Sequence, residues 1–473
     1  MQKKIVILGA GPAGLACAYK LCKESSHQIY LIDKCSEVGG FGSSFKWKNH
    51  ILDIGPHAFH TRGGEPEALI RSLFSENPEY MIEGKKNVVV YLKGKLFRYP
   101  LQVSEVFLKF NLFLTIKILI HFTLTSFFHA FVSIPIENFE DWGRKRFGST
   151  LYKLSFGHYT EKVWKTKATN ISAKFAAEKI QGFNFINLIK RILKIGGQIT
   201  EPYYQTWIYH KYGSGRLFKM LSEKIIEAKG IISLDSNIIN INIDKDNIIS
   251  VNYEKDGKLY NLQCDYLINT IPLSHFITKL NIDVPFSVKY STTKLSYISL
   301  IVAYLEFKAE EITDYHWIYL LDDKFIFNRI TEQKHLSHST IEDGKTILSF
   351  ELTCRENDQL WQLEDSKIFE LVQKEIEQIP FISKNKIIDY LIKRFPNAYE
   401  IYYKDFDKQA DVIFSYLRTF KNLLTIGRRG LFLQGDMHNS MEIGINAAKL
   451  VLRDKITEND KDNFYRSYIK YID

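Results

Sequence analysis

A glycine-rich turn near the N-terminus constrains the fold of this 473-residue chain more than any other feature. Residues 5–8 form a short apolar run that predicts a buried parallel strand, and a second such run follows at residues 28–32. Between the two runs lie Gly9, Gly11 and Gly14, followed by apolar residues at helical spacing. This order of strand, glycine turn, helix and strand predicts an α/β fold with a Rossmann-like domain.

The spacing of this turn indicates a dinucleotide site. Gly9 permits the tight turn, Gly11 lets the backbone approach a pyrophosphate, and Gly14 lets the helix pack closely on the strand. The start of the helix offers N–H groups and the positive end of its dipole to phosphates. Asp33 ends the second strand, where its carboxylate can accept hydrogen bonds from a ribose. A glycine turn without a ligand is the alternative, and the complete βαβ context disfavours it.

Composition and charge exclude several classes of protein. Apolar residues make up 45% and charged residues 25% of the chain, which is typical of a folded globular protein. The net charge of +9 favours an anionic ligand such as a nucleotide, or a membrane surface. The basic residues are spread along the chain, which argues against a nucleic-acid partner.

The cysteines and the N-terminus indicate in which cellular compartment the protein is expected. Five cysteines form no CxxC pair, so we expect neither a disulfide framework nor a metal site. A reducing compartment suits such a chain. The N-terminus does not read as a signal peptide, because its apolar run opens directly into the glycine motif. We therefore expect a cytoplasmic protein.

Residues 106–136 are the most hydrophobic stretch of the chain. The stretch also carries Lys109, Asn111, Lys117, His121 and His129. Because no window of about 20 residues is free of polar groups, a buried helical hairpin is the favoured interpretation. A helix lying in a membrane interface, with peripheral membrane association of the protein, and a membrane-spanning helix are the alternatives.

Further along the chain, the apolar patterns predict a mixture of elements. Alternating apolar residues predict strands near residues 231–241, 297–307 and 346–352. Helical spacing covers residues 217–226 and 366–376.

Two motifs at opposite ends of the chain match one family. A Gly39-Gly40 pair with small polar residues follows Asp33, and residues 425–428 lead to Gly435 and Asp436. In both places the chain resembles the flavoprotein family that contains amine oxidases, protoporphyrinogen oxidase and UDP-galactopyranose mutase. The resemblance implies FAD as the cofactor, with Asp436 on the ribityl chain and the following helix facing the flavin. NAD(P)H is the candidate reductant.

The resemblance also assigns cofactor contacts and domains. The implied cofactor-binding residues are Gly9, Gly11, Pro12, Ala13, Gly14, Asp33, Lys34, Gly40, Phe41, Ser43, Gly55, His57, Ile238, Arg428, Gly435, Asp436 and Met437. A Rossmann-like FAD-binding domain of the glutathione-reductase type is expected from the discontinuous segments 1–75, 203–285 and 409–473. A mainly helical domain is expected over 76–202 and an antiparallel-sheet substrate domain over 286–408.

Within this family the motifs are most similar to UDP-galactopyranose mutase. Residues 52–61 resemble its flavin-facing loop, in which Gly55 lets backbone approach the flavin and His57 can hydrogen-bond near it, while His60 is given a structural role. Residues 159–164 resemble its YTEKxW segment, whose aromatic residues help to hold the uracil and nucleotide. The implied catalytic residues are His57, Arg329 and Tyr399. The implied substrate-binding residues are Tyr159, Thr160, Trp164, Tyr204, Arg329 and Tyr399.

Three positions depart from the mutase pattern. Gln434 stands where the mutases have a tyrosine that binds the substrate diphosphate, and Glu400 stands where a proline follows the substrate-side tyrosine. The arginine of the mobile loop has no counterpart in residues 181–185. The flavin motifs are therefore complete, whereas the motifs that clamp the diphosphate are altered.

Three functions follow from the resemblance. The first is an enzyme that acts on a nucleotide-linked sugar through reduced flavin, with Arg329 neutralising the diphosphate. The second is an FAD-dependent oxidoreductase of the amine oxidase or protoporphyrinogen oxidase type. The third is a non-enzymatic carrier with the same fold, like the carriers of prenylated GTPases. The sequence leaves the oligomeric state open.

Overall fold

The computed structural model describes residues 2–99, 105, 108–132, 135–174, 206–453 and 456–469. The chain divides into two compact units, each built from separated segments. Unit 1 comprises Met1–Lys85, Gln205–Ser296 and Asp407–Asp473, and unit 2 comprises Lys86–Tyr204 and Tyr297–Phe406. The segments expected to be helical (76–202) and antiparallel (286–408) thus share unit 2, apart from about their first ten residues.

Unit 1 is organised around a five-stranded parallel sheet with the strand order β10-β2-β1-β14-β20. All three segments of the unit contribute strands, which are β1 (Lys4–Leu8), β2 (Gln28–Ile32), β10 (Ile231–Ser233), β14 (Tyr266–Asn269) and β20 (Leu423–Thr425). The apolar run in β1 is buried from Ile5 to Leu8, as expected of a central parallel strand. The predicted Rossmann-like domain from discontinuous segments is confirmed.

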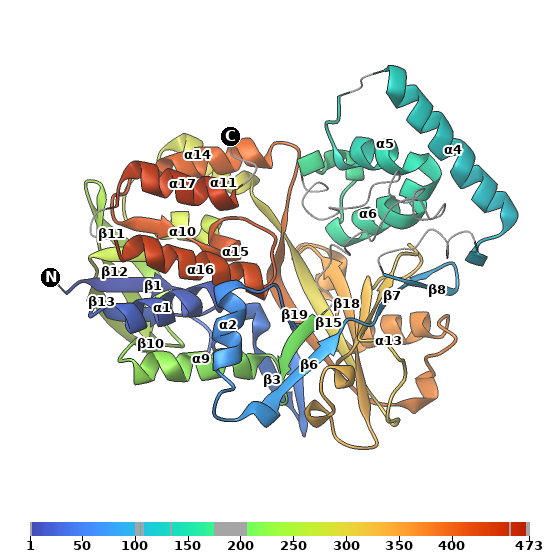
Figure 1. Ribbon diagram of the computed structural model, residues 1–473, viewed down its shortest axis with the longest axis horizontal. Coiled ribbons are helices and arrows are strands. Elements are labelled where there is room, and N and C mark those ends of the chain that lie inside the picture. Colours follow the sequence, from blue (N-terminus) through green and yellow to red (C-terminus); the bar gives the residue numbers. More distant parts are fainter. Residues whose placement is uncertain are drawn as a thin grey trace. The chain divides into compact units, whose positions relative to one another are not determined.

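Two helices of unit 1 pack against each other. The helix α1 (Pro12–Glu24) follows β1, and α16 (Met437–Val451) lies beside α1 (Figure 1). Gly444 permits this closeness, because a Cβ there would lie 2.2 Å from the carbonyl oxygen of Ala13. The predicted helix at 217–226 is α9 (Gly215–Glu227), which also packs on α1.

Smaller elements complete unit 1. They form an antiparallel meander of β11 (Asn237–Asp244), β12 (Asn247–Lys255) and β13 (Lys258–Gln263), the pair β3 (Ser44–Trp47) and β4 (His50–Asp53), and the sheet β5 (Phe59–His60), β9 (Thr206–His210) and β6 (Met81–Lys85). The remaining helices of five or more residues are α2 (Gly64–Ser72), α10 (Leu273–Lys279), α11 (Phe286–Lys294), α14 (Phe406–Arg418) and α17 (Glu458–Tyr468).

Unit 2 contains a seven-stranded sheet with the order β19-β15-β18-β17-β16-β7-β8. Its strands are β7 (Val88–Leu92), β8 (Lys95–Arg98), β15 (Ser296–Phe307), β16 (Trp317–Leu320), β17 (Arg329–Glu332), β18 (Thr346–Cys354) and β19 (Ile387–Ile401). The pairing is largely antiparallel, as expected, but β16 and β7 run parallel. Helix α13 (Asp365–Ile376) buries Ile368, Val372 and Ile376 in the same core.

Within the described part of the hydrophobic stretch, residues 112–131 form one long helix of unit 2 whose apolar side chains are mostly exposed, so the favoured interpretation as a buried hairpin is wrong for them. Helix α4 (Leu112–Phe131) packs along α5 (Phe139–Tyr152), and most of its apolar side chains are exposed (Figure 1). Its sequence is apolar around the whole circumference, so a single neighbouring helix can cover only one stripe. Among the described residues, α4 is the one helix that has the length and apolar composition to cross a membrane.

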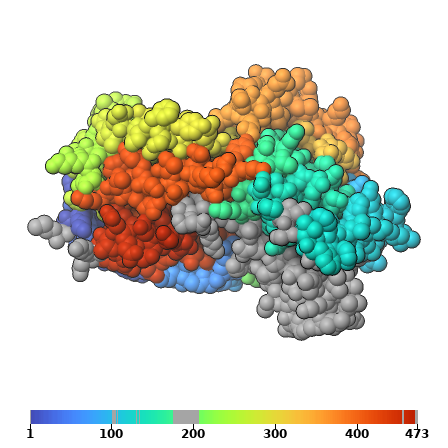
Figure 2. Space-filling view, turned by 90° about the horizontal axis from the view of Figure 1, so that it is seen from above, coloured from blue at the N-terminus to red at the C-terminus, as the bar shows by residue number. Residues whose placement is uncertain are grey.

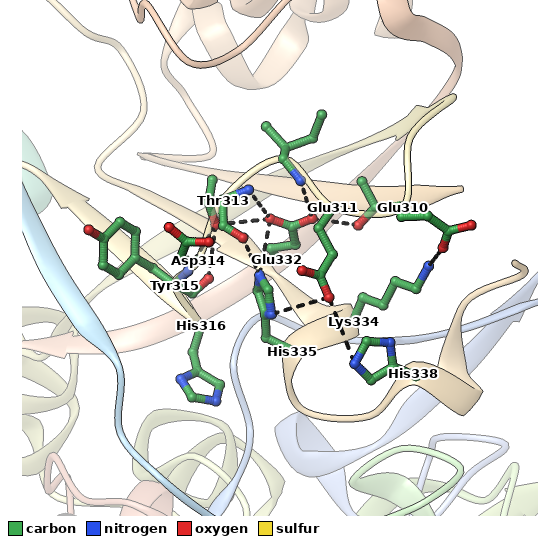
Figure 3. A network of polar contacts seen from close by, with 12 residues as sticks. Glu310, Glu311, Thr313, Asp314, Tyr315, His316, Glu332, Lys334, His335 and His338 are labelled. Atoms are coloured by element: carbon green, nitrogen blue, oxygen red, sulfur yellow. Dashed lines mark hydrogen bonds and ion pairs between the residues drawn. The ribbon is translucent and has the colours of Figure 1, made fainter. Parts of the chain in front are cut away.

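A buried carboxylate at the end of β17 binds several neighbouring segments of unit 2 (Figure 3). Glu332 accepts hydrogen bonds from the backbone N–H groups of Ile312 (2.9 Å) and Thr313 (2.8 Å) and from the hydroxyl of Thr346 (2.7 Å). The ring of His335 lies 3.4 Å from the same carboxylate. Burial alone would raise the pKa of Glu332, but these donors together hold it below its usual value.

Candidate functional site

The glycine turn of unit 1 has the geometry of a phosphate cradle. Gly9 has a φ of +106°, and a Cβ there would lie 2.2 Å from Oγ1 of Thr270. A Cβ on Gly14 would lie 2.0 Å from the carbonyl oxygen of Gly9. At Gly11, in contrast, a Cβ would meet nothing within 4 Å. Packing within the protein explains Gly9 and Gly14, whereas the open space over Gly11 fits a ligand that approaches the backbone.

The predicted ribose acid lies directly beside this turn. The carboxylate of Asp33 accepts hydrogen bonds from the backbone N–H groups of Ala10 (2.6 Å) and Cys35 (2.8 Å), which fix its position. The carbonyl oxygen of Asp33 accepts a hydrogen bond of 2.9 Å from the backbone N–H of Ser236. Ile238 follows Ser236 by two residues, so this bond ties its segment to the acid. Lys34 is exposed at the end of β2.

The Gly39-Gly40 segment folds back on the turn. Gly39 donates to the carbonyl of Ala10 at 2.8 Å, and a Cβ on Gly40 would lie 3.5 Å from Cα of Gly11. Ser43 closes a short 3-10 turn by donating to the carbonyl of Gly40 at 3.1 Å, and the ring of Phe41 lies under Arg429 at 4.6 Å.

The C-terminal motif reaches the same place. A Cβ on Gly427 would lie 2.8 Å from Cβ of Ala13, and a Cβ on Gly42 would lie 3.1 Å from Sδ of Met437. The structure thus brings the 425–437 segment, which contains Arg428 and Gly435, against the start of α1 and the Gly40–Gly42 turn. These residues fit a dinucleotide cofactor such as FAD, with phosphates at the start of α1 and further atoms along the C-terminal segment.

The predicted ribityl acid caps helix α16 and is held by a cation. Asp436 accepts a hydrogen bond of 3.1 Å from the N–H of Asn439, and its other oxygen is paired with Arg62. Arg62 also donates to the amide oxygen of Asn439 at 3.0 Å. Sequence reasoning missed Arg62, although its place just after the flavin-facing block was a usable signal.

The flavin-facing block contains a second residue that sequence reasoning missed. Asp53 is fully buried and accepts hydrogen bonds from the hydroxyls of Ser44 and Tyr209, both at 2.6 Å, and from the N–H of Ser214 at 3.2 Å. Burial raises the pKa of Asp53 to about 6 even though these donors oppose the shift. Asp53 thereby ties the end of β4, four residues before His57, to β9 and to the start of α9.

His57 itself lies on a glycine-dependent bend. Gly55 has a φ of +81°, and Nδ1 of His57 lies 3.3 Å from the carbonyl oxygen of Gly55. His60 lies on β5, where it pairs with Trp207 of β9, and this position is consistent with the structural role given to it.

Unit 2 brings Tyr159 and Arg329 to Tyr319 of β16, and Trp164 to Tyr399. The ring of Tyr159, on α6 (His158–Trp164), meets that of Tyr319 edge-on at 6.2 Å. The guanidinium of Arg329, on β17, lies 5.9 Å from the same ring. Trp164 meets Tyr399 of β19 at 6.4 Å. Thr160 is buried on α6, whereas Tyr204 lies outside the described residues.

Arg329 is already paired within the protein. Its Nε and Nη2 atoms each donate at 2.7 Å to Glu351, which lies directly opposite on β18. Burial disfavours the charge, but Glu351 holds the pKa of Arg329 well above its usual value. Among the described residues, Nη1 of Arg329 makes no hydrogen bond, so one guanidinium nitrogen remains for a ligand.

A half-buried lysine on α6 fixes the neighbouring loop. Nζ of Lys162 donates to the carbonyl oxygens of Leu320 (2.6 Å), Asp322 (2.8 Å) and Phe327 (3.3 Å). Burial lowers the pKa of Lys162 to about 7. Sequence reasoning missed this residue, although it lies inside the YTEKxW segment. Because Lys162 shares α6 with Tyr159 and Trp164, it holds them in register with β16 and β17.

The predicted catalytic residues are divided between the two units. His57 belongs to unit 1, together with the glycine turn, Asp33 and Asp436, whereas Arg329 and Tyr399 belong to unit 2. In the described part of the chain, no group of three His, Cys, Asp or Glu residues is arranged to hold a metal ion.

Comparisons with known proteins agree with this architecture. A family profile described as an NAD(P)-binding Rossmann-like domain matches residues 7–75. An L-amino-acid oxidase from Crotalus adamanteus is 30% identical over 114 residues. The match covers 22% of this chain and 22% of that protein, so the chain spans about a fifth of the length of the curated relatives it matches.

Solved structures match over nearly the whole chain. A reduced UDP-galactopyranose mutase superposes with a TM-score of 0.82 at 19% identity, covering 98% of both chains. A putative protoporphyrinogen oxidase from Exiguobacterium sp. 255-15 gives 0.72 at 15% identity, covering 95% of this chain and 99% of that one. A putrescine oxidase gives 0.65 at 12% identity, covering 95% and 98%. The expected resemblance is thus confirmed: this chain has the fold shared by UDP-galactopyranose mutase, protoporphyrinogen oxidase and the amine oxidases.

Proposed function

We propose that this chain is an FAD-dependent enzyme that acts on a nucleotide-linked sugar with its flavin reduced. The observation that carries the proposal is the cluster around Tyr319. Tyr159 on α6 and Arg329 on β17 both lie beside this ring, although they come from distant parts of the chain. Trp164, also on α6, meets Tyr399 of β19, and all four residues belong to one unit. Aromatic faces suit a nucleobase, and a guanidinium suits a diphosphate.

Unit 1 supplies the site for the cofactor in this proposal. The start of α1 and Gly11 receive the pyrophosphate, Asp33 the adenosine ribose, and the Asp436 segment the ribityl chain. Reduced flavin supplies a nucleophilic centre when it is bound, and the protein supplies orientation and charge.

The ion pair of Arg329 and Glu351 limits how this chain holds a diphosphate. The pair carries no net charge. Arg329 therefore offers a ligand one directed hydrogen-bond donor, Nη1, rather than an unpaired positive charge. Gln434 replaces the family tyrosine with an amide at the same sequence position. We infer that further groups of the chain, besides Nη1 of Arg329, bind the diphosphate of the nucleotide-linked sugar.

The test is a turnover assay under anaerobic conditions. Purified protein that shows a flavin spectrum is incubated with a panel of nucleotide sugars, either oxidised or after reduction by dithionite, NADH or NADPH. An isomer of equal mass that appears only with reduced protein supports the proposal. Bleaching of oxidised flavin by substrate would instead establish the oxidoreductase alternative, and a colourless protein would favour the carrier.

A matched pair of variants ties the activity to the cluster. Tyr159→Phe keeps the aromatic face and should keep most of the affinity for the nucleotide. Tyr159→Ala removes the face and should weaken binding by about 1–3 kcal/mol, measured by calorimetry with the nucleotide diphosphate alone. Equal binding by the wild type and Tyr159→Ala contradicts the assigned role.

A further inference from the structure

Helix α4 presents an apolar face that no described part of the chain covers. One stripe of the helix, which includes Thr115 and Ile118, is buried against unit 2. On the opposite side the exposed fractions reach 78% at Phe113, 66% at Phe127 and 75% at Phe131. The other exposed apolar side chains of the helix are Leu112, Ile116, Leu119, Ile120, Leu124 and Phe128. A patch of this kind marks a binding surface.

The packing of α4 determines how this face can be used. The ring of His121 lies 2.5 Å from the hydroxyl of Thr150 and 3.1 Å from that of Ser149, both on α5. Gly148 permits the close approach, because a Cβ there would lie 2.9 Å from the backbone of Phe122. The helix is therefore packed lengthwise on α5, and residues of this part of the chain appear in cyan at the surface (Figure 2).

The charge around the helix indicates what covers it. Residues 106–136 contain no acidic residue. Residues 95–174 contain 12 Lys and Arg against 5 Asp and Glu, a net charge of +7 out of +9 for the whole chain. The exposed cations of this stretch include Lys95, Arg98, Lys117, Arg144, Arg146 and Lys153. An apolar face within a cationic region complements an anionic lipid bilayer.

Lys117 illustrates the arrangement on the helix itself. It follows Phe113 by four residues and precedes Ile120 by three, so it lies beside both on the exposed face. Its long aliphatic stem can lie along the acyl region while the ammonium group reaches lipid phosphates. The only other ionisable side chains of α4 are two histidines, His121 and His129.

We propose that α4 is a monotopic membrane anchor, lying in the plane of an anionic bilayer with the face that includes Phe113, Ile120 and Phe127 inserted among the lipids. Substrates and products of the enzyme would then be exchanged at a membrane surface. A spanning orientation would require α4 to leave α5 and lose the packing and hydrogen bonds described above. A second copy of the chain is the other occupant that the experiment must distinguish.

Flotation with lipid vesicles tests the proposal on the full-length protein. We expect the wild type to float with vesicles of phosphatidylcholine and phosphatidylglycerol, less with phosphatidylcholine alone, and less at high salt. The double variant Phe113→Ser/Phe127→Ser should lower the partition coefficient by about a hundredfold, because each buried aromatic side chain contributes about tenfold. Lys117→Gln should lower only the part that depends on anionic lipid.

A matched control uses apolar side chains that are equally exposed in unit 1. Phe286 on α11 is 82% exposed and Leu259 on β13 is 73% exposed. The double variant Phe286→Ser/Leu259→Ser should therefore bind vesicles like the wild type. Retained thermal unfolding profiles show that each variant is folded. The proposal is overturned if the wild type stays with the protein fraction, or if both double variants lose binding equally.

Two further measurements separate the alternatives. A wild-type dimer that Phe113→Ser/Phe127→Ser converts to a monomer, without vesicle binding by either, would assign the face to a second copy. Phe113→Trp and Phe131→Trp place probes about 27 Å apart along the helix. A helix in the interface gives both probes the same quenching by brominated lipids, whereas unequal depths would overturn the in-plane orientation.

Discussion

Arg329 and Glu351 lie opposite each other on the adjacent strands β17 and β18 and form a buried ion pair with two hydrogen bonds of 2.7 Å. The side chain of Glu351 is 1% exposed and that of Arg329 is 18% exposed. The pair fixes the guanidinium beside Tyr319 and neutralises its charge. It therefore decides both the stability of the sheet and the part of Arg329 that a ligand can reach.

Removal of one partner should be costly because the other charge stays buried. We expect Glu351→Gln to lower the free energy of unfolding by about 3–5 kcal/mol in urea titrations. The double variant Arg329→Met/Glu351→Leu should recover most of this loss. Lys367→Gln, which breaks an exposed ion pair with Glu370, should change stability by less than about 0.5 kcal/mol. A double variant as unstable as Glu351→Gln would contradict the assignment.

Gly11 and Gly14 should respond differently to alanine. Gly11→Ala adds a Cβ in open space at a φ of −77°, so the unfolding free energy of the flavin-free protein should stay within about 0.5 kcal/mol. Its flavin content should fall sharply because the methyl group enters the proposed pyrophosphate position. Gly14→Ala should destabilise the flavin-free protein itself, because its Cβ would lie 2.0 Å from a backbone oxygen. Full flavin loading of Gly11→Ala would exclude the assigned role.

Asp53 should make unit 1 more stable in mild acid. Its pKa is about 6 in the folded protein against an ordinary value of 3.8, so the folded state binds the proton more tightly. This stabilisation is complete below about pH 4 and is lost as the pH rises through about 6, for a difference of about 2–3 kcal/mol. Asp53→Asn should remove that slope from stability measured between pH 4 and 7. Ser44→Ala removes one donor and should move the window to higher pH.

Glu332 should act in the opposite direction in unit 2. Its pKa lies below the ordinary 4.5, so its contribution is present above that pH and is lost as the pH falls through the lowered value. Glu332→Gln should flatten the acid limb of the unfolding curve and lower stability at neutral pH by at least about 1 kcal/mol. Asp343→Asn, at an exposed carboxylate of the same unit, serves as the control and should leave the neutral stability unchanged.

Lys162 should matter for the order of the substrate cluster. Lys162→Met leaves three carbonyl oxygens without their donor, and we expect a loss of about 3 kcal/mol in unfolding free energy. Lys167→Met, at an exposed lysine nearby, should change stability by less than about 0.5 kcal/mol. If both variants unfold alike, the three hydrogen bonds do not position α6.

The sequence by itself determined the elements whose signals are local. The glycine turn, the strands at 5–8 and 28–32 and the acid Asp33 follow one another within a few dozen residues, and each has a conformational reason at its own position. The same holds for α9 and α13, whose apolar spacing matches the stripe that each helix buries. Family motifs extended this local reading to Tyr159 and Arg329.

Tertiary structure alone decided the contacts between distant residues. Nothing near Arg329 in the sequence indicates that Glu351 neutralises it, and nothing near Asp436 indicates Arg62, which lies 374 residues away. The environment of an ionisable group depends on which segments fold over it, and so do the opposite pKa shifts of Asp53 and Glu332. The exposure of one face of α4 also depends on tertiary structure. Hydrophobicity predicts that a side chain avoids water, whereas packing decides which surface covers it.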